Sequence, residues 1–237
     1  MVLGCRREAR PLHLMDWNAL TLSLQLAGAT IVVLLPFAVL IARPLAWRNF
    51  PGKGLIDALV TLPLLLPPTV LGFYLLTSFG PQSWLGQLWS GLTGRSLVFS
   101  FDGLLVASLI VNLPFAVQPI QRAFAAIPQE AREAAWCCGL SSWQTLWRVE
   151  LPLAWPGVIS ALVLTFVHTL GEFGVVLMVG GNLDGATRTL SIAIYDKVQG
   201  FDEASAGQMS ALLVVIAFAA VGGLHALTQR VGVGRRD

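Results

Sequence analysis

Five long apolar runs without a single Asp, Glu, Lys or Arg constrain the fold of this chain more than any other feature. They cover residues 19–42, 58–94, 103–121, 151–171 and 204–229. A helix that crosses a bilayer needs about 20 mostly apolar residues. Only 12% of the chain is charged, against about 25% in soluble domains. The sequence therefore predicts an all-α membrane protein with five transmembrane helices.

Two of these runs do not match the length of one span. The second is too long and contains a turn-type cluster at residues 78–82. We expect its first part to cross the membrane, and the part with Trp84 and Trp89 to form an interfacial loop, because Trp favours the membrane boundary. The fourth run is expected to continue past Glu172, to about Gly180.

The placement of Lys and Arg predicts the orientation of the spans. The segments after the first, third and fifth runs carry the basic residues Arg43, Arg48, Lys53, Arg122, Arg132, Arg148, Arg230, Arg235 and Arg236. The other two loops have fewer basic residues, and the second of them is rich in acidic ones. Because cytoplasmic loops carry an excess of Lys and Arg, the N-terminus is expected outside and the C-terminus in the cytoplasm.

The first residues disagree with this orientation. Arg6, Arg7 and Arg10 would place a basic tail outside, against the positive-inside tendency. Met15, which is followed by an acidic residue and a Trp, is a more natural beginning. We expect native translation to start there, so that residues 1–14 are a non-native tail and residues 15–237 form one transmembrane domain.

The segment of residues 128–152, between the third and fourth spans, reads as two helices around a turn. Pro128 suits a first helical position, Glu130 suits the positive end of the helix dipole, and Gly139 suits a C-cap. Ser141 and Gln144 have the spacing of a capping box. This box predicts a second helix that ends at Pro152.

The same segment resembles the EAA loop of binding-protein-dependent ABC importer permeases. The resemblance rests on the spacing of Glu133, Ala134, Ala135, Gly139, Val149, Leu151 and Pro152. It implies a type I importer permease whose coupling helix docks on a cytoplasmic ABC ATPase dimer. ATP and Mg would be bound by that dimer, with no cofactor and no catalysis in this chain. An ordinary amphipathic loop is the alternative interpretation.

A wider resemblance to molybdate permeases extends from Met15 to Arg236. It includes residues 50–54, 62–68 and 170–174, the last reading Leu-Gly-Glu-Phe-Gly. It implies a multi-pass protein of the bacterial inner membrane, a periplasmic molybdate-binding protein as partner, and a homodimer. Sulfate and tungstate permeases share much of this pattern and remain open as alternatives.

Small residues in the last span are suited to close helix packing, either in that dimer or within the subunit. They are Ala217, Ala219, Ala220, Gly222 and Gly223.

Candidate residues for the translocation pathway lie in the second and fourth spans. Pro67 and Pro68 are expected to bend a helix and free its carbonyl groups. A polar stripe in the fourth span cannot comfortably face lipid, and it consists of Thr165, His168, Thr169 and Glu172. A structural role is open for each of them. For Glu172 we expect pairing or backbone capping, because a bare carboxylate would repel an oxyanion.

Other functions fit less well. The formal charge is only +2, and the sequence contains no basic stripe of the kind that binds nucleic acid. A secondary transporter would usually show an internal repeat and a second carboxylate within the spans, and the sequence contains neither. No HExxH, GxSxG or phosphate-binding loop is present. The polar segment of residues 182–189 is expected either to meet the binding protein or to be a plain solvated loop.

Overall fold

The computed structural model describes residues 15–233, and this part of the chain contains helices and no β-strand. The elements are α1 (Trp17–Trp47), α2 (Lys53–Leu65), α3 (Pro68–Phe79), α4 (Trp84–Thr93), α5 (Phe101–Ala125), α6 (Gln129–Cys137), α7 (Ser142–Thr145), the π-helical turn η1 (Leu146–Glu150), α8 (Leu151–Gly171), α9 (Gly174–Gly180), α10 (Leu190–Gln199) and α11 (Glu203–Val233). The predicted tail and start at Met15 concern residues 1–14, which lie outside the described part.

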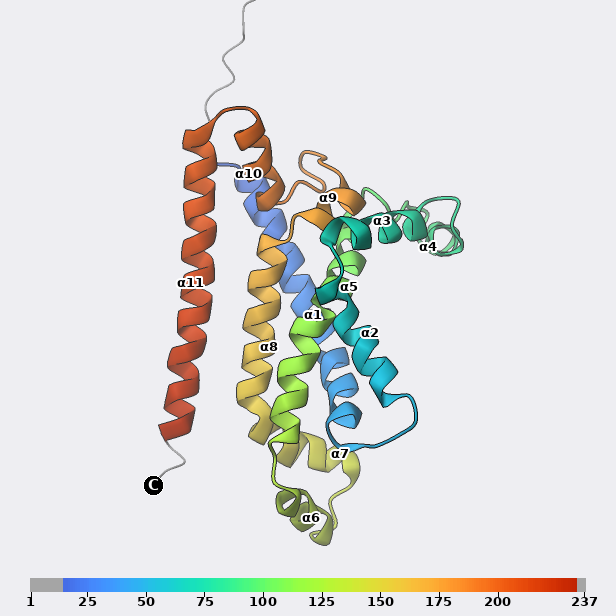
Figure 1. The fold of residues 1–237 in the computed structure, drawn as a ribbon, viewed down its shortest axis with the longest axis vertical. Coiled ribbons are helices and arrows are strands. Elements are labelled where there is room, and N and C mark those ends of the chain that lie inside the picture. Colours follow the sequence, from blue (N-terminus) through green and yellow to red (C-terminus); the bar gives the residue numbers. More distant parts are fainter. Residues whose placement is uncertain (1–14, 234–237) are drawn as a thin grey trace, which may run out of the picture.

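Helices α1, α5 and α8 form the centre of the molecule (Figure 1). Their shared core includes the fully buried side chains of Ile120, Phe124 and Leu146. Gly157 brings α8 close to α5, because a Cβ there would lie 2.3 Å from that of Ala123. Small residues of this kind let membrane helices approach until their backbones nearly touch.

Four helical stretches are long and apolar enough to cross a membrane: Trp17–Trp47, Phe101–Ala125, Ser142–Gly171 and Glu203–Ala226. The pair α2 and α3 also qualifies, but it is bent by 109°. The five predicted spans are therefore present when this bent pair counts as one. Figure 1 places the start of α1 and the end of α11 at opposite ends of the bundle, with α6 at the same end as the end of α11.

The bend between α2 and α3 lies at the consecutive prolines. Helix α2 ends at Leu65, Pro67 is extended, and Pro68 begins α3. Proline lacks an N–H and clashes with the preceding turn, so a straight helix cannot pass this point. The kink predicted here is confirmed.

Beyond α3, the expected interfacial loop is wrong in part. The segment with Trp84 and Trp89 is helix α4, which Ser83 caps by accepting the N–H of Gly86 at 2.9 Å. Gly86 permits this fold because a Cβ there would lie 2.1 Å from the carbonyl oxygen of Gly80. The short helix satisfies backbone groups that an open loop would expose.

The fourth span is also shorter than predicted. Helix α8 ends at Gly171 and does not continue to Gly180, because Glu172 adopts an extended conformation. The remaining residues form α9, which packs against α3 and turns away from α8 (Figure 1). The long apolar run concealed this break, since α9 is buried in protein and is as apolar as a span.

The second helix of the loop does not end at Pro152. Helix α7 runs through η1 directly into α8, with a π-type bond from the N–H of Leu151 to the carbonyl of Leu146. Pro152 lies in the first turn of α8, where its missing N–H interrupts the ladder only locally. The wider π turn provides that adjustment.

Helix α11 stands beside the bundle and contacts α8 and α10. Only 6% of the apolar stretch with which α11 would cross the membrane is buried inside the subunit. A Cβ at Gly222 or Gly223 would meet nothing within 4 Å. Gly222 and Gly223 therefore do not serve close packing within the subunit, and a role of the small residues in a dimer stays a prediction.

Candidate functional site

The segment of residues 128–152, for which the sequence predicts a coupling role, forms a knob at one end of the bundle (Figure 1). On α6, Glu133 and Ala134 are exposed, whereas Ala135 faces the protein and is 6% exposed. The Glu133 carboxylate accepts a hydrogen bond from the Gln129 side chain at 2.6 Å. The segment therefore presents a small surface with two exposed carboxylates, those of Glu130 and Glu133, to any docking partner.

The turn after α6 has the geometry that the sequence predicts. Gly139 has φ +79°, a left-handed conformation that glycine adopts at little cost. Its Cβ position is open, with nothing within 4 Å, so backbone conformation rather than space selects glycine. The Ser141–Gln144 capping box is formed in both directions, which confirms the start of the second helix. Pro128 is one position off, as the N-cap of α6.

Glu150 ties this knob to the membrane helices. Its side chain is fully buried. It accepts two hydrogen bonds from the Arg43 guanidinium of α1, Nε to Oε2 at 2.7 Å and Nη2 to Oε1 at 3.1 Å. Arg43 also donates to the carbonyl of Ser142 at 2.8 Å. This forked pairing fixes direction as well as distance, so α1 and the α7–η1 segment are held in one orientation.

Arg132 connects α6 to the same cluster. Its Nε lies 3.5 Å from Oε1 of Glu150. Its guanidinium carbon lies 3.7 Å from the ring centroid of Trp47 and 5.1 Å from that of Trp136. Cation–π contacts of this kind strengthen when they are shielded from water. Three segments that are distant in sequence thus converge on one carboxylate.

The sequence alone does not predict this cluster. Glu150 falls within the predicted second helix of residues 128–152, and Arg43 and Arg132 serve only as signals of orientation. The available signal was a lone acidic residue at the edge of an apolar run on a strongly basic side of the membrane. A charge so close to the apolar region requires a partner, but the sequence does not say which arginine supplies it.

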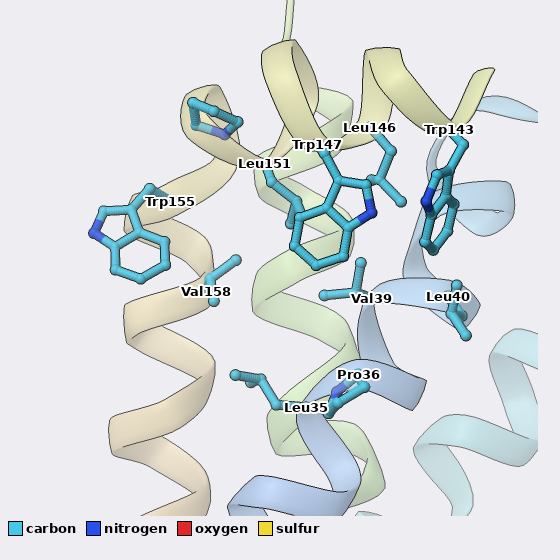
Figure 2. Close-up of a pocket in the computed structure, with 11 residues that line it drawn as sticks. Leu35, Pro36, Val39, Leu40, Trp143, Leu146, Trp147, Leu151, Trp155 and Val158 are labelled. Atoms are coloured by element: carbon cyan, nitrogen blue, oxygen red, sulfur yellow. The ribbon is translucent and has the colours of Figure 1, made fainter. Parts of the chain in front are cut away.

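Leu151 and Pro152 continue from this cluster along α8. Both line an apolar groove of about 460 Å³ between α1 and the α7–α8 segment, which Figure 2 shows with Trp143, Trp147 and Trp155 around it. Leu151 and Pro152 do not lie on the exposed face of α6. The residues of the EAA-like motif are thus split between the knob and the first turn of α8.

The pathway candidates gather at a different place. Pro68, His168 and Glu172 line a small cavity of about 110 Å³ where the α2–α3 bend meets the end of α8. Twenty residues separate Pro152 from Glu172, a distance of about 30 Å along a helix. The two groups of predicted site residues are therefore at opposite ends of α8.

Glu172 makes the capping contact that was expected. Its Oε1 accepts the N–H of Val175 at 3.0 Å, at the start of α9. Its Oε2 lies 3.9 Å from Nε2 of His168. The Glu172 backbone carbonyl accepts a hydrogen bond from the Ser191 hydroxyl at 2.6 Å. The carboxylate thus satisfies one backbone N–H that the break between α8 and α9 leaves free, and Ser191 satisfies one carbonyl.

His168 is held from two other sides. Its Nδ1 lies 3.2 Å from the side-chain oxygen of Asn112, and its ring stacks on Phe115 with centroids 4.0 Å apart. Thr165 and Thr169 are buried, with the Thr169 hydroxyl donating to the Thr165 carbonyl at 2.8 Å. The polar stripe therefore faces protein, as predicted, and its two Thr members are buried and do not line the cavity.

The bend between α2 and α3 packs against the break between α8 and α9 at this cavity. A Cβ on Gly174 would lie 2.7 Å from the Cβ of Pro68. A Cβ on Gly72 would lie 2.9 Å from that of Met178. Glycine at both places lets α9 lie directly on α3. Pro67, which does not line the cavity, contributes by setting the bend.

The loop of residues 182–189 is organised around Arg188. The guanidinium donates to the Asn182 side chain at 2.7 Å, and it lies within 4.0 Å of carboxylate oxygens of Asp16, Asp184 and Asp196. The Thr187 hydroxyl is buried and donates to the carbonyl of Gly180 at 2.6 Å. The loop has a defined shape, and its contact with a binding protein stays a prediction.

Sequence comparison places this fold among transport proteins. The chain is 47% identical over 208 residues to the molybdenum transport system permease protein ModB of Azotobacter vinelandii, covering 88% of this chain and 92% of that one. It is 35% identical to the ModB protein of Escherichia coli K12, covering 78% and 80%. It is also 34% identical to a probable sulfate transport system permease protein of Chlorella vulgaris, covering 84% and 75%.

Solved structures agree at the level of fold. A bacterial ABC transporter that imports alginate matches with a TM-score of 0.73 and 18% identity, covering 90% of this chain and 79% of that one. The MetNI methionine ABC transporter, in an inward-facing conformation, matches with a TM-score of 0.63 and 20% identity, covering 91% and 93%. Residues 34–232 match the binding-protein-dependent transport system inner membrane component family. Since that match spans most of the chain, this multi-pass membrane protein belongs to that family.

Proposed function

We propose that this chain is the membrane-spanning permease subunit of an ATP-driven importer of molybdate. The observation that carries the proposal is the knob formed by α6 and its turn, which presents Glu133 and Ala134 outward and is tied through Glu150 to α1 and the root of α8. A docking surface joined rigidly to membrane helices is what transmission of force requires.

In the proposed cycle, a cytoplasmic ABC ATPase dimer binds α6. That dimer binds ATP with Mg and hydrolyses the ATP. Motion of α6 passes to α1 and α8 through the cluster of Arg43, Arg132 and Glu150. Helix α8 carries it about 30 Å to the cavity lined by Pro68, His168 and Glu172. These residues take a pathway role because both bent segments meet there and can change their relative angle.

The remaining parts of the assembly follow from the same proposal. A periplasmic binding protein delivers the anion to the end with the loop of residues 182–189, which places α6 in the cytoplasm. A second copy of the chain completes the pathway, because one subunit of five spans encloses too little space. The exposed small-residue face of α11 is suited to such a contact.

Molybdate is the proposed substrate because the identity to a molybdenum permease reaches 47%, against 34% for a sulfate permease. Labelled molybdate uptake in cells with and without the chain tests this, with excess tungstate or sulfate as competitor. Loss of uptake on deletion, and block by tungstate but not sulfate, is expected. Impaired sulfate uptake with unchanged molybdate uptake would assign the chain to sulfate instead.

Gly139→Asp tests the coupling role separately. Cys137 and Cys138 are free and exposed at the end of α6, so docking of the ATPase should shield them from a maleimide reagent. The variant strains the left-handed turn and should lose both the shielding and the uptake while still inserting in the membrane. Gly91→Ala, at an exposed glycine of α4 with open space around it, is the matched control. Normal uptake by Gly139→Asp would contradict the coupling role.

A further inference from the structure

The apolar groove of about 460 Å³ is not used by the transport mechanism above. Leu35, Pro36 and Leu40 of α1 line one side. The other side carries three indole rings, of Trp143, Trp147 and Trp155, each more than half exposed, as Figure 2 shows. Within the described residues no charged side chain lines it. Its natural occupant is a hydrocarbon chain.

The depth of the groove matches the edge of a bilayer. Helix α1 begins at Trp17, an exposed interfacial residue. Leu35 and Leu40 lie about 27 Å and 35 Å further along the helix, at 1.5 Å per residue. The hydrocarbon core of a bilayer is about 30 Å thick. The groove therefore straddles the boundary between acyl chains and headgroups, where tryptophan concentrates.

A basic pocket adjoins the groove at this boundary. It measures about 340 Å³, shares Leu40 with the groove, and is lined by Arg43, Arg48 and Arg132. Among the described residues that line it there is no acid. Glu150 neutralises one of the two positive charges of Arg43 and Arg132. Within the part of the chain that the structure describes, Arg48 forms no ion pair. The pocket is thus cationic.

We propose that the groove and the basic pocket together bind one anionic phospholipid of the leaflet next to α6. One acyl chain lies in the groove between α1 and the three tryptophans. The phosphate lies in the pocket and pairs chiefly with Arg48, the arginine not engaged with Glu150. The assignment to the cytoplasmic leaflet rests on the proposed function, whereas the lipid site itself does not.

Such a lipid would bridge the segments that the coupling cluster joins. Its phosphate would contact α1, and its chain would lie against α7, η1 and α8. Basic pockets between membrane helices on the cytoplasmic side are suited to anionic headgroups. An occupied site would stiffen the joint through which α6 moves α8, so transport would depend on anionic lipid.

The direct test uses the full chain, purified in detergent and incubated with equal amounts of phosphatidylglycerol and phosphatidylcholine of identical acyl chains. Lipid that stays bound is counted by native mass spectrometry. We expect one phosphatidylglycerol per chain to be retained in preference. Arg48→Gln should lower that preference about fivefold, since a basic residue near an anionic surface is worth about that factor.

Trp147→Ala should weaken retention of both lipids, because it shortens the apolar wall. Arg95→Gln and Trp84→Ala, which change exposed residues outside the groove and the pocket, are the matched controls and should bind as the parent does. All four positions are exposed, so folding is preserved. Soluble glycerol phosphate should not displace the lipid, since it lacks the chain that fills the groove.

Equal retention of the two lipids by the parent chain, or displacement by glycerol phosphate, would overturn the proposal. So would a second copy in the groove, detected by cross-linking through Trp155→Cys in a chain whose three native cysteines are serine. The measurement needs neither ATP nor molybdate. A failed lipid assay with normal molybdate uptake would therefore leave the proposed function intact. Preferred retention of phosphatidylglycerol by a chain that does not support molybdate uptake would leave the lipid site intact.

Discussion

Two buried glutamates, Glu150 and Glu172, stand at opposite ends of α8 and are satisfied in different ways. Glu150 is fully buried and is paired with Arg43 at 2.7 Å and with Arg132 at 3.5 Å. Glu172 is 9% exposed and has a backbone N–H at 3.0 Å and His168 at 3.9 Å. One carboxylate is fixed by charges and the other by a helix end.

The difference assigns the two ends different mechanical properties. A forked ion pair between distant segments resists rotation and separation together, which suits a joint that transmits force. A carboxylate that caps a short helix next to a bend holds only its own helix start. The end with α6 is therefore expected to move as one body, while the end with the cavity is free to change its angle.

The largest effect is expected for Glu150→Ala. The change leaves the guanidinium groups of Arg43 and Arg132 near the interior without their carboxylate, and breaking such a pair costs about 3–5 kcal/mol. The thermal unfolding midpoint in detergent should fall sharply. Glu133→Gln, at an exposed glutamate of the same segment, is the control and should unfold as the parent does. Equal midpoints for both variants would show that the joint is not electrostatic.

Gly174→Ala tests the contact between the two breaks. Its Cβ would lie 2.7 Å from that of Pro68, and overpacking of this kind costs about 1–3 kcal/mol. We expect reduced stability and loss of uptake. Gly171→Ala, three residues away with nothing within 4 Å of its Cβ, should be close to neutral. If the two variants behave alike, α9 does not lie on α3 as described.

Glu172 allows a graded substitution. Glutamine keeps an oxygen that accepts the N–H of Val175, whereas alanine removes it, and a lost cap costs about 1 kcal/mol. Glu172→Gln should therefore unfold near the parent midpoint and transport normally, with Glu172→Ala below it. Loss of uptake by a stable Glu172→Gln would instead assign the charge itself to the pathway. That result would make the two glutamates more alike than the structure indicates.

The smallest effect concerns Asp202, a half-buried carboxylate that caps α11. Hydrogen bonding by Ser205, then by Lys197, holds the pKa of Asp202 below its usual range. A lowered pKa adds stability above the pKa of the unfolded chain, and this is lost as pH falls through the folded value. The stability difference between the parent and Asp202→Asn should thus be present at neutral pH and vanish in acid. A difference that persists in strong acid would contradict the charge as its cause.

Much of the fold was predictable because it depends on neighbours along the chain. The uncharged runs predict α1, α5, α8 and α11. Pro67 and Pro68 predict the bend, and the capping box of Ser141 with Gln144 predicts the start of α7. Each signal acts over a few residues, so the sequence contains it in full. The error at α9 arose because a buried helix is as apolar as a span, and the error at Pro152 because a π turn absorbs the proline. At α4, which is mostly exposed, the turn-type residues before Trp84 concealed a helix that Ser83 caps.

The sequence by itself determined that this chain lies in a membrane, how many spans it has, and where the helix that carries Glu133 and its glycine turn must lie. Tertiary structure alone decided which charges meet, because Arg43 and Glu150 are 107 residues apart. It also decided that Gly174 lies on Pro68. Apolar helices can pack in many arrangements with similar burial, and only the assembled contacts of small residues and buried charges select one of them.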